Sequence, residues 1–130
     1  MVLDTHVLVW WLASPAKLTA KARRAIRSAM ASGPLSASAA SILEIVTLVR
    51  RGRLTLTTSA DRWLEDLLRL PELRIESVTA EIAAKAGGFG DEIPGDPLDR
   101  IILATAAVLG VPLVTADQRL RRLQPVPTIW

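Results

Sequence analysis

Length, composition and charge already exclude several classes of protein. The 130 residues leave room for one domain, and half of them are hydrophobic, as in an ordinary folded protein. The absence of Cys excludes disulfides and Cys-containing zinc sites, and a single His excludes a multi-His metal site. With no Tyr and one Phe, we do not expect a platform that stacks RNA bases on several aromatic side chains. Any metal site must therefore consist mostly of carboxylates, which favour hard cations such as Mg²⁺ or Mn²⁺.

The chain is basic and carries no recognisable membrane segment. Lys and Arg number 16 against 13 Asp and Glu, and Arg, which suits bidentate contacts to phosphate, predominates. The longest stretch without charge, residues 101–116, contains Gly110 and Pro112 and is shorter than the ~20 apolar residues of a membrane span. Asp4 precedes any Lys or Arg, unlike the start of a signal peptide. We expect a cytoplasmic protein with no membrane partner.

Short strands and helices alternate in the first part of the chain. An apolar run over residues 1–3 predicts a strand, and Thr5 is placed to cap a helix that continues to residue 12. Polar caps and terminal glycines predict the elements that follow. These are a helix over residues 19–32, a very short strand that begins at Leu35, a helix over 38–51, a helix capped by Ser59, a strand over 73–78 and a helix that begins at Thr79.

Two of these helices have a clear apolar side. The helix over residues 38–51 carries a stripe of four aliphatic side chains at helical spacing, and the helix capped by Ser59 has four apolar residues that we expect to face inward. The stripe consists of Ile42, Ile45, Val46 and Val49, and the inward set consists of Trp63, Leu64, Leu67 and Leu68.

The second part of the chain opens with an irregular loop and a sharply marked helix. Residues 87–95 contain four glycines and a proline, which predicts a loop. The run Asp96-Pro97-Leu98-Asp99 then suits a helix start, with Asp at the N-cap and Pro at the first helical position, and Gly110 ends that helix. A strand over 111–115, a short helix over 116–123 and an edge strand over 126–129 complete an α/β sandwich around a mostly parallel sheet.

Four acidic residues stand out against this background. Asp4 directly follows the first strand, Asp117 follows the strand over 111–115, and Asp99 lies in the first turn of a helix that leads back from the same edge. Glu44 lies inside the apolar helix over 38–51. Ligands of such sheets bind beyond the carboxyl ends of the strands, and acidic groups among apolar neighbours need a compensating charge. A divalent cation held by these carboxylates would support phosphodiester hydrolysis.

Each of these residues also has a purely structural interpretation. Asp4 and Asp117 can cap helices, Asp99 can complement a helix dipole, and Glu44 can pair with an Arg. We interpret Asp96 as a helix cap. It is the joint placement of the other four that favours a site.

Other polar and aromatic residues are weaker candidates. His6, beside a strand end and without a recognisable nucleophile, is interpreted as a packing residue. Trp10 and Trp11 are interpreted as core or dimer surface. Three adjacent Arg pairs are either solvated or available for phosphate contacts, namely Arg23/Arg24, Arg50/Arg51 and Arg121/Arg122.

Four segments, in this order and at this length, carry a resemblance to a known family. They are Val2-Leu3-Asp4-Thr5-His6, then Ser41-Ile42-Leu43-Glu44-Ile45 with Arg50-Arg51-Gly52-Arg53-Leu54, then Asp96-Pro97-Leu98-Asp99-Arg100 with Leu103-Ala104-Thr105-Ala106, and Leu113-Val114-Thr115-Ala116-Asp117. The chain resembles the PIN-domain ribonucleases, specifically the VapC-type toxins of bacterial type II toxin–antitoxin systems. The resemblance covers residues 1–130 as a single PIN domain.

The resemblance implies a Rossmann-like three-layer α/β/α sandwich and an acidic quartet, Asp4, Glu44, Asp99 and Asp117, that holds Mg²⁺ or Mn²⁺. Asp4 and Asp99 correspond to the principal metal ligands, and Asp117 to a ligand that binds directly or through water. Glu44 corresponds either to a ligand of a second ion or to the residue that orients the attacking water. The supporting residues are Thr115, Thr5 and Asp96.

The implied function is that of a metal-dependent endoribonuclease toxin whose products carry 5′-phosphate and 3′-hydroxyl ends. A VapB-type antitoxin would hold it inactive, a homodimer is expected, and operator DNA would be reached only indirectly through the antitoxin. Two departures from the family are Ile93-Pro94-Gly95, where many relatives have His or Arg before the Asp-Pro motif, and Leu98 in place of Phe. The residues leave three alternatives open: a non-catalytic RNA- or protein-binding module, a phosphotransfer or phosphatase domain, and a DNA nuclease of the same fold.

Outside the acidic quartet, the excess of basic over acidic residues is larger than in the whole chain. Nine acidic residues then remain against 16 basic ones, so the rest of the chain is strongly cationic. This division suits a protein that holds a cation at one site and contacts a phosphate backbone elsewhere.

Overall fold

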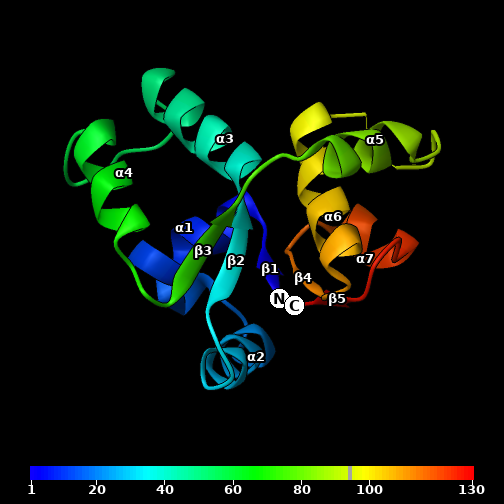
Figure 1. The fold of residues 1–130 in the computed structure, drawn as a ribbon. Coiled ribbons are helices and arrows are strands. Elements are labelled where there is room, and N and C mark those ends of the chain that lie inside the picture. The colour runs from blue at the N-terminus through cyan, green and yellow to red at the C-terminus, as the bar shows by residue number, and fades with distance from the viewer. Residues whose placement is uncertain (94) are drawn as a thin grey trace.

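A parallel sheet with its first strand in the middle organises the molecule. The computed structural model describes residues 1–93 and 95–130. Within them, β1 (Val2–Leu3) is flanked on one side by β2 (Leu35–Ser38) and β3 (Leu73–Glu76), and on the other by β4 (Leu113–Val114) and β5 (Thr128–Ile129) (Figure 1). All four pairings between these strands are parallel. The predicted α/β class with a mostly parallel sheet is confirmed.

Local capping explains where most helices begin. The side chains of Thr19, Ser38, Ser59, Thr79 and Asp96 each accept a hydrogen bond from a backbone N–H of the helix that follows, as the sequence predicted. The helices are α1 (Thr5–Ala13), α2 (Ala20–Met30), α3 (Ala39–Arg50), α4 (Ala60–Leu68), α5 (Ala80–Gly88), α6 (Pro97–Leu109) and α7 (Gln118–Leu123), with a 3₁₀ turn η1 (Pro15–Lys17) after α1. None of these helices is long and apolar enough to cross a membrane within the described ranges.

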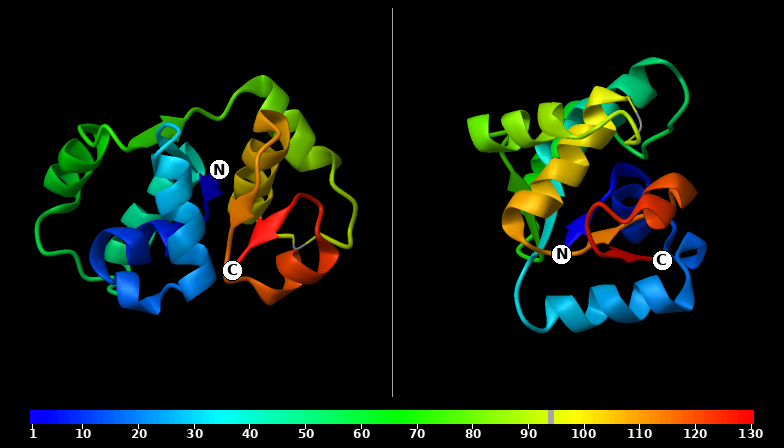
Figure 2. Two further views of the ribbon diagram at one scale, coloured as in Figure 1. Left: turned by 90° about the horizontal axis from the view of Figure 1, so that it is seen from below. Right: turned by 90° about the vertical axis from the view of Figure 1, so that its right-hand side faces the viewer.

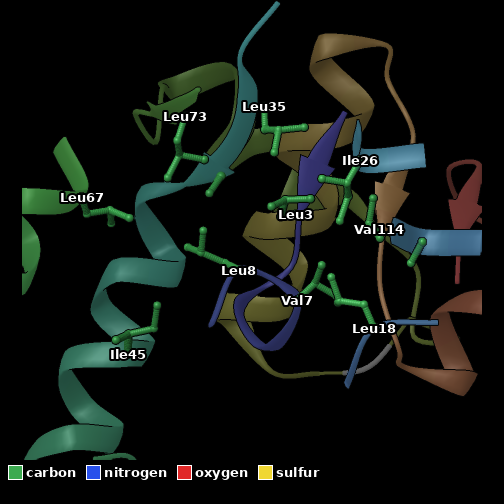
Figure 3. Close-up of a cluster of buried hydrophobic side chains, with 12 residues drawn as sticks. Leu3, Val7, Leu8, Leu18, Ile26, Leu35, Ile45, Leu67, Leu73 and Val114 are labelled. Atoms are coloured by element: carbon green, nitrogen blue, oxygen red, sulfur yellow. The ribbon is translucent and has the colours of Figure 1, made fainter. Parts of the chain in front are cut away.

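Alternation along the strands divides the core between the two faces of the sheet. Leu3 and Val114 lie in one buried cluster, which they share with side chains from α1, α2, α3 and α4 (Figure 3). Val2 and Leu113 lie in a second cluster, together with side chains from α6 and α7. Successive strand residues point to opposite faces, so even a strand of two residues contributes to both clusters. Figure 2 shows the helices on both sides of the sheet.

The strands are shorter than predicted, and several boundaries differ. β3, β4 and β5 occupy only part of the predicted ranges 73–78, 111–115 and 126–129. The loop predicted over residues 87–95 begins later, since α5 continues through Gly88; Pro94, in the same predicted loop, lies outside the described residues. The inward orientation predicted for Leu68 is wrong, because its side chain is 61% exposed.

The first helix is capped by a different residue from the one predicted. Asp4, not Thr5, is the N-cap of α1, and Asp4 Oδ1 accepts a hydrogen bond of 2.9 Å from the Val7 N–H. Thr5 is the first helical residue and is buried, and its hydroxyl donates to Ser41 Oγ at 3.1 Å. The exchange moves the cap by one residue and attaches the start of α1 to α3.

Candidate active site

Two of the predicted carboxylates lie where the strand order reverses, at the ends of β1 and β4. Asp4 follows β1, and its N–H donates to the Val114 carbonyl at 3.1 Å, which holds the residue against β4. Asp117 follows β4 and caps α7 by accepting from the Arg119 N–H at 2.7 Å. The Asp117 N–H donates to Thr115 Oγ1 at 3.0 Å. Open parallel sheets bind their ligands at this reversal point.

The third and fourth carboxylates reach the same place from helices. Asp99 is the third residue of α6, whose N-cap Asp96 accepts from the Leu98 N–H at 2.8 Å. Glu44 lies on α3, and its Oε2 atom is buried without a hydrogen-bond partner among the described residues. No ion pair involving Glu44 is present in that part of the chain, so the alternative of an Arg partner is not what the structure shows.

These residues line one cavity of about 370 Å³, which we call the carboxylate cavity. Its wall contains all four members of the predicted quartet and the three predicted supporting residues, and no Lys or Arg within the described residues. The residues that line it are Asp4, Thr5, His6, Trp10, Glu44, Asp96, Asp99, Ile102, Thr115, Ala116, Asp117 and Leu120. Among the described residues only Asp117 has an ion-pair partner, Arg119 at 3.6 Å from outside the wall, so most of the negative charge of the cavity is uncompensated.

The pKa shifts report the same crowding of negative charge. Burial raises the pKa of Asp4 above its usual range, an effect that hydrogen bonds with the Thr115 side chain and the Val7 backbone oppose. The pKa of Asp99 is raised to about 6, first by burial and then by repulsion from Asp96, Glu44, Asp117 and Asp4. Each of these carboxylates therefore resists ionisation unless a positive charge joins it.

The carboxyl groups fit a hard divalent cation in kind and in number. Oxygen donors with spare lone pairs and a shared negative field are what Mg²⁺ and Mn²⁺ prefer, and the buried Glu44 Oε2 has an unused acceptor. No three such side chains within residues 1–93 and 95–130 approach closely enough to form a complete ligand set. The structure thus gathers the donors around one cavity without bringing them into coordination distance of a common point.

Two buried hydroxyl contacts that sequence reasoning missed fix the frame of the cavity. The Thr5 hydroxyl donates to the buried Ser41, and the Thr105 hydroxyl lies 3.4 Å from the buried Ser38 Oγ while also donating to the Ile101 carbonyl at 2.8 Å. These contacts join α1 to α3 and α6 to the start of α3. Small hydroxyl residues at otherwise apolar helix positions are the only sequence signal for them.

Arg100 holds the chain that leads into α6. Its guanidinium donates to the carbonyl oxygens of Ala86 at 3.0 Å, Ile93 at 3.2 Å and Gly90 at 3.4 Å, and also to that of Phe89. The sequence showed Arg100 only as part of a motif. Because Arg100 directly follows Asp99, its planar guanidinium group holds in place the residues that precede the first turn of α6.

His6 and Trp10 line the cavity beside the carboxylates. The interpretation of His6 as a packing residue is wrong, because its side chain is exposed and lines the cavity. The His6 and Trp10 ring centroids lie 5.9 Å apart, and Trp10 is half-buried between the cavity and the core cluster. The two residues therefore form an aromatic rim beside the carboxylates.

Comparison with known proteins identifies the class that this fold and site define. The family model described as PIN domain matches residues 1–124, and the chain belongs to the PIN-domain family. It is 38% identical to Ribonuclease VapC22 from Mycobacterium tuberculosis (strain ATCC 25618 / H37Rv), over 100% of this chain and 98% of the relative. The predicted resemblance to VapC-type PIN-domain ribonucleases is confirmed.

Solved structures share the fold at lower identity. The crystal structure of VapBC2 from Rickettsia felis, bound to a DNA fragment from their promoter, matches with a TM-score of 0.71 and 16% identity over 98% of this chain and 95% of that one. FitAcB from Neisseria gonorrhoeae matches with a TM-score of 0.65 and 19% identity over 98% and 94%. These likenesses support the Rossmann-like three-layer sandwich.

Proposed function

We propose that this protein, as one PIN domain over residues 1–130, hydrolyses RNA phosphodiester bonds as the toxin of a toxin–antitoxin module. Mg²⁺ or Mn²⁺ is the cofactor, and RNA in the cytoplasm is the substrate. The observation that carries the proposal is a cavity with five carboxyl groups and no Lys or Arg in its wall, at the reversal point of the sheet. A polyanionic substrate is bound at such a place only when a cation neutralises it.

In this proposal each carboxylate has a definite task. Asp4 and Asp99 would hold the cation, and Asp117 would hold it directly or through water while its Oδ1 accepts the backbone hydrogen bonds of the α7 cap. Glu44 accepts a hydrogen bond from the attacking water at Oε2, its unpartnered atom. A bound divalent cation polarises the phosphoryl oxygen and lowers the pKa of water. Water would add to phosphorus as the bond to the 3′-oxygen breaks. The water would lose a proton to solvent and the leaving 3′-oxygen would gain one from solvent, which leaves 5′-phosphate and 3′-hydroxyl ends.

The relatives indicate the partners. Solved neighbours include VapBC and FitAcB assemblies, one of them bound to promoter DNA. We infer that a VapB-type antitoxin inhibits this chain and that operator DNA is reached only through that partner. We also infer a homodimer, favoured by the exposed Leu43 and Val46, which lie one turn apart on α3 with side chains 58% and 37% exposed.

The test is RNA cleavage by the purified protein and its Asp99→Asn variant. With Mg²⁺ or Mn²⁺, wild type should cut a fluorescent single-stranded RNA, and EDTA should stop it. Asp99→Asn should lower kcat/KM on the order of 10³-fold, because several kcal/mol of charge stabilisation are lost. Asp61→Asn is the matched control, since Asp61 is also a first-turn acid, on α4, but is exposed and does not line the cavity.

Retention of full activity by Asp99→Asn would show that the site is assigned wrongly. The toxin role has a separate readout: expression of wild type alone should stop growth of the host, and expression of Asp99→Asn should not. Normal growth with active purified enzyme would remove the toxin role and leave the nuclease.

A further inference from the structure

A second polar cavity lies beside α7, and all the charged residues in its wall are basic. It has a volume of about 460 Å³ and is lined by Lys21 of α2, Arg121 and Arg122 of α7, and Trp130, together with Gln118, Gln124 and Thr128. No Asp or Glu lines it, and none of its three cations takes part in an ion pair among the described residues. We call it the basic cavity. Unpaired guanidinium groups beside amide and hydroxyl side chains are suited to phosphate oxygens.

One short helix separates the basic cavity from the carboxylate cavity. Asp117 and Leu120, at the start and on one side of α7, line the carboxylate cavity. Gln118, Arg121 and Arg122 of the same helix line the basic cavity. Residues four apart share a helix face, so Arg121 follows Asp117 by one turn and the two cavities are neighbours along α7. Figure 1 shows α7 beside β5 at the end of the chain.

Aromatic rings span the interval between the two cavities. Trp10 lines the carboxylate cavity, Trp130 lines the basic cavity, and their ring centroids lie 5.6 Å apart with planes tilted by 46°. His6 continues the row on the carboxylate side, with its centroid 5.9 Å from that of Trp10. All three side chains are at least partly exposed. Proteins that bind single strands combine such stacking faces with cationic side chains along the backbone.

We propose that single-stranded RNA runs from the carboxylate cavity across Trp10 and Trp130, and that Lys21, Arg121 and Arg122 bind its phosphates a few nucleotides from the scissile bond. This inference rests on the proposed nuclease function and adds to it a strand path and its direction across the surface. The alternative occupant of a basic cavity is an acidic peptide. The row of aromatic rings and its continuity with the carboxylate cavity favour RNA, since an acidic peptide would need the charges alone.

The first experiment removes the two arginines and compares them with a matched pair. Arg121→Ala/Arg122→Ala should raise KM for a single-stranded RNA of about 12 nucleotides roughly tenfold and leave kcat unchanged, because the subsite holds substrate away from the reacting atoms. Arg50→Ala/Arg51→Ala removes the same charge from an adjacent pair at the end of α3 that lines neither cavity, and should change neither constant.

Salt dependence separates phosphate contacts from a general loss of charge. Binding of a fluorescein-labelled oligouridylate is measured by anisotropy in an Asp99→Asn background, so that the probe survives. Each phosphate contact to a single strand contributes about 0.7 to the slope of log affinity against log salt, so removal of Arg121 and Arg122 should lower the slope by roughly 1.4. The control pair should leave the slope unchanged.

Substitution of Trp130 tests the stacking step. Trp130→Leu keeps an apolar contact to the core and should weaken oligouridylate binding about tenfold, whereas Trp130→Phe should restore most of the affinity. Trp130 also packs against a core cluster, so the thermal midpoint of each variant is measured in parallel. Equal affinities for the Leu and Phe variants, at equal stability, would contradict stacking.

The outcomes distinguish this inference from the proposed function. If wild type cuts RNA while the Arg121/Arg122 variant keeps its KM and salt slope, the strand path is wrong and the nuclease stands. If wild type neither binds nor cuts RNA, both fail. If the variant loses affinity for an oligoglutamate peptide and not for RNA, the basic cavity belongs to a protein partner and the proposal is overturned.

Discussion

The carboxylate cavity and the basic cavity share α7 and have opposite electrostatics. One has five carboxyl groups and no Lys or Arg in its wall, and the other has three basic residues and no carboxylate. Neither is neutralised by ion pairs inside its own wall. Asp117 forms its ion pair with Arg119, at 3.6 Å, and Arg119 lines neither cavity.

The small net charge of +3 over the whole chain therefore conceals local concentrations of opposite charge at these two cavities. A folded protein that concentrates like charges in this way keeps them in place against mutual repulsion, which lowers the stability of the folded state. Ligands of opposite charge relieve that repulsion. The negative cavity calls for a cation and the positive one for phosphate, and a metal-dependent nuclease uses both.

The largest expected effect is at the carboxylate cavity, where a bound cation would neutralise the negative charge. Addition of Mg²⁺ or Mn²⁺ at 100 times the dissociation constant should stabilise the fold by about 2.7 kcal/mol, or roughly 10 °C in thermal midpoint. Asp99→Asn should lose most of this shift. Arg121→Ala/Arg122→Ala should keep it, because the basic cavity takes no part in cation binding.

Differential scanning fluorimetry with and without each metal measures this shift. An equal shift in wild type and Asp99→Asn would place the cation elsewhere on the molecule. Absence of any shift would argue for a non-catalytic binding module on the same fold.

A smaller effect concerns a cation that belongs to neither cavity. Arg100 lies next to Asp99 yet donates to four backbone carbonyls of the segment before α6. Arg100→Lys keeps the charge but not the planar fork, and should lower the thermal midpoint by about 5 °C, since hydrogen bonds from a charged donor contribute roughly 1.5–3 kcal/mol.

Hydrogen exchange should show faster amide exchange over residues 86–93 in the Arg100→Lys variant. Arg119→Lys is the control, because Arg119 is exposed and its ion pair contributes little. If both variants keep the wild-type midpoint, Arg100 is a solvated charge and the segment is held by its apolar contacts.

Local chemistry made much of the fold predictable. Residues such as Ser38 and Asp96 cap helices through contacts two or three residues away, so the sequence identifies them without tertiary information. The cap of α1 was misplaced by one position because Asp4 and Thr5 are both capping residues. Leu68 was misplaced for a different reason: its exposure depends on which elements cover α4, and no pattern within the helix contains that information.

The two cavities differ in how much of each could be predicted from the sequence. Asp4 and Asp117 follow strands, so strand order alone brings them to one edge of the sheet, and their gathering around one cavity could be expected; their catalytic roles remain predictions. Lys21 and Trp130 are separated by most of the chain and meet only because α2 lies near β5. Composition argued against a base-stacking platform, and it gave no sign that the Trp10 and Trp130 ring centroids lie 5.6 Å apart.

The smallest expected effect is a pH dependence of stability, which follows from the raised pKa of Asp99 in the carboxylate cavity. The pKa of Asp99 is about 6 in the folded chain and near 3.8 when unperturbed, so between these values the folded state binds more protons than the unfolded state. Stability without metal should therefore fall as pH rises from about 4 to above 6, by a few degrees in midpoint after allowance for solvent screening.

The midpoint of Asp99→Asn minus that of wild type, in EDTA, should grow over this range, while the same difference for Asp61→Asn stays flat. A flat difference for Asp99→Asn would show that neither burial nor the neighbouring carboxylates raise the pKa of Asp99 in the folded chain. With saturating Mg²⁺ the sign should reverse, since a cation binds the ionised carboxylate and stabilises wild type more as pH rises.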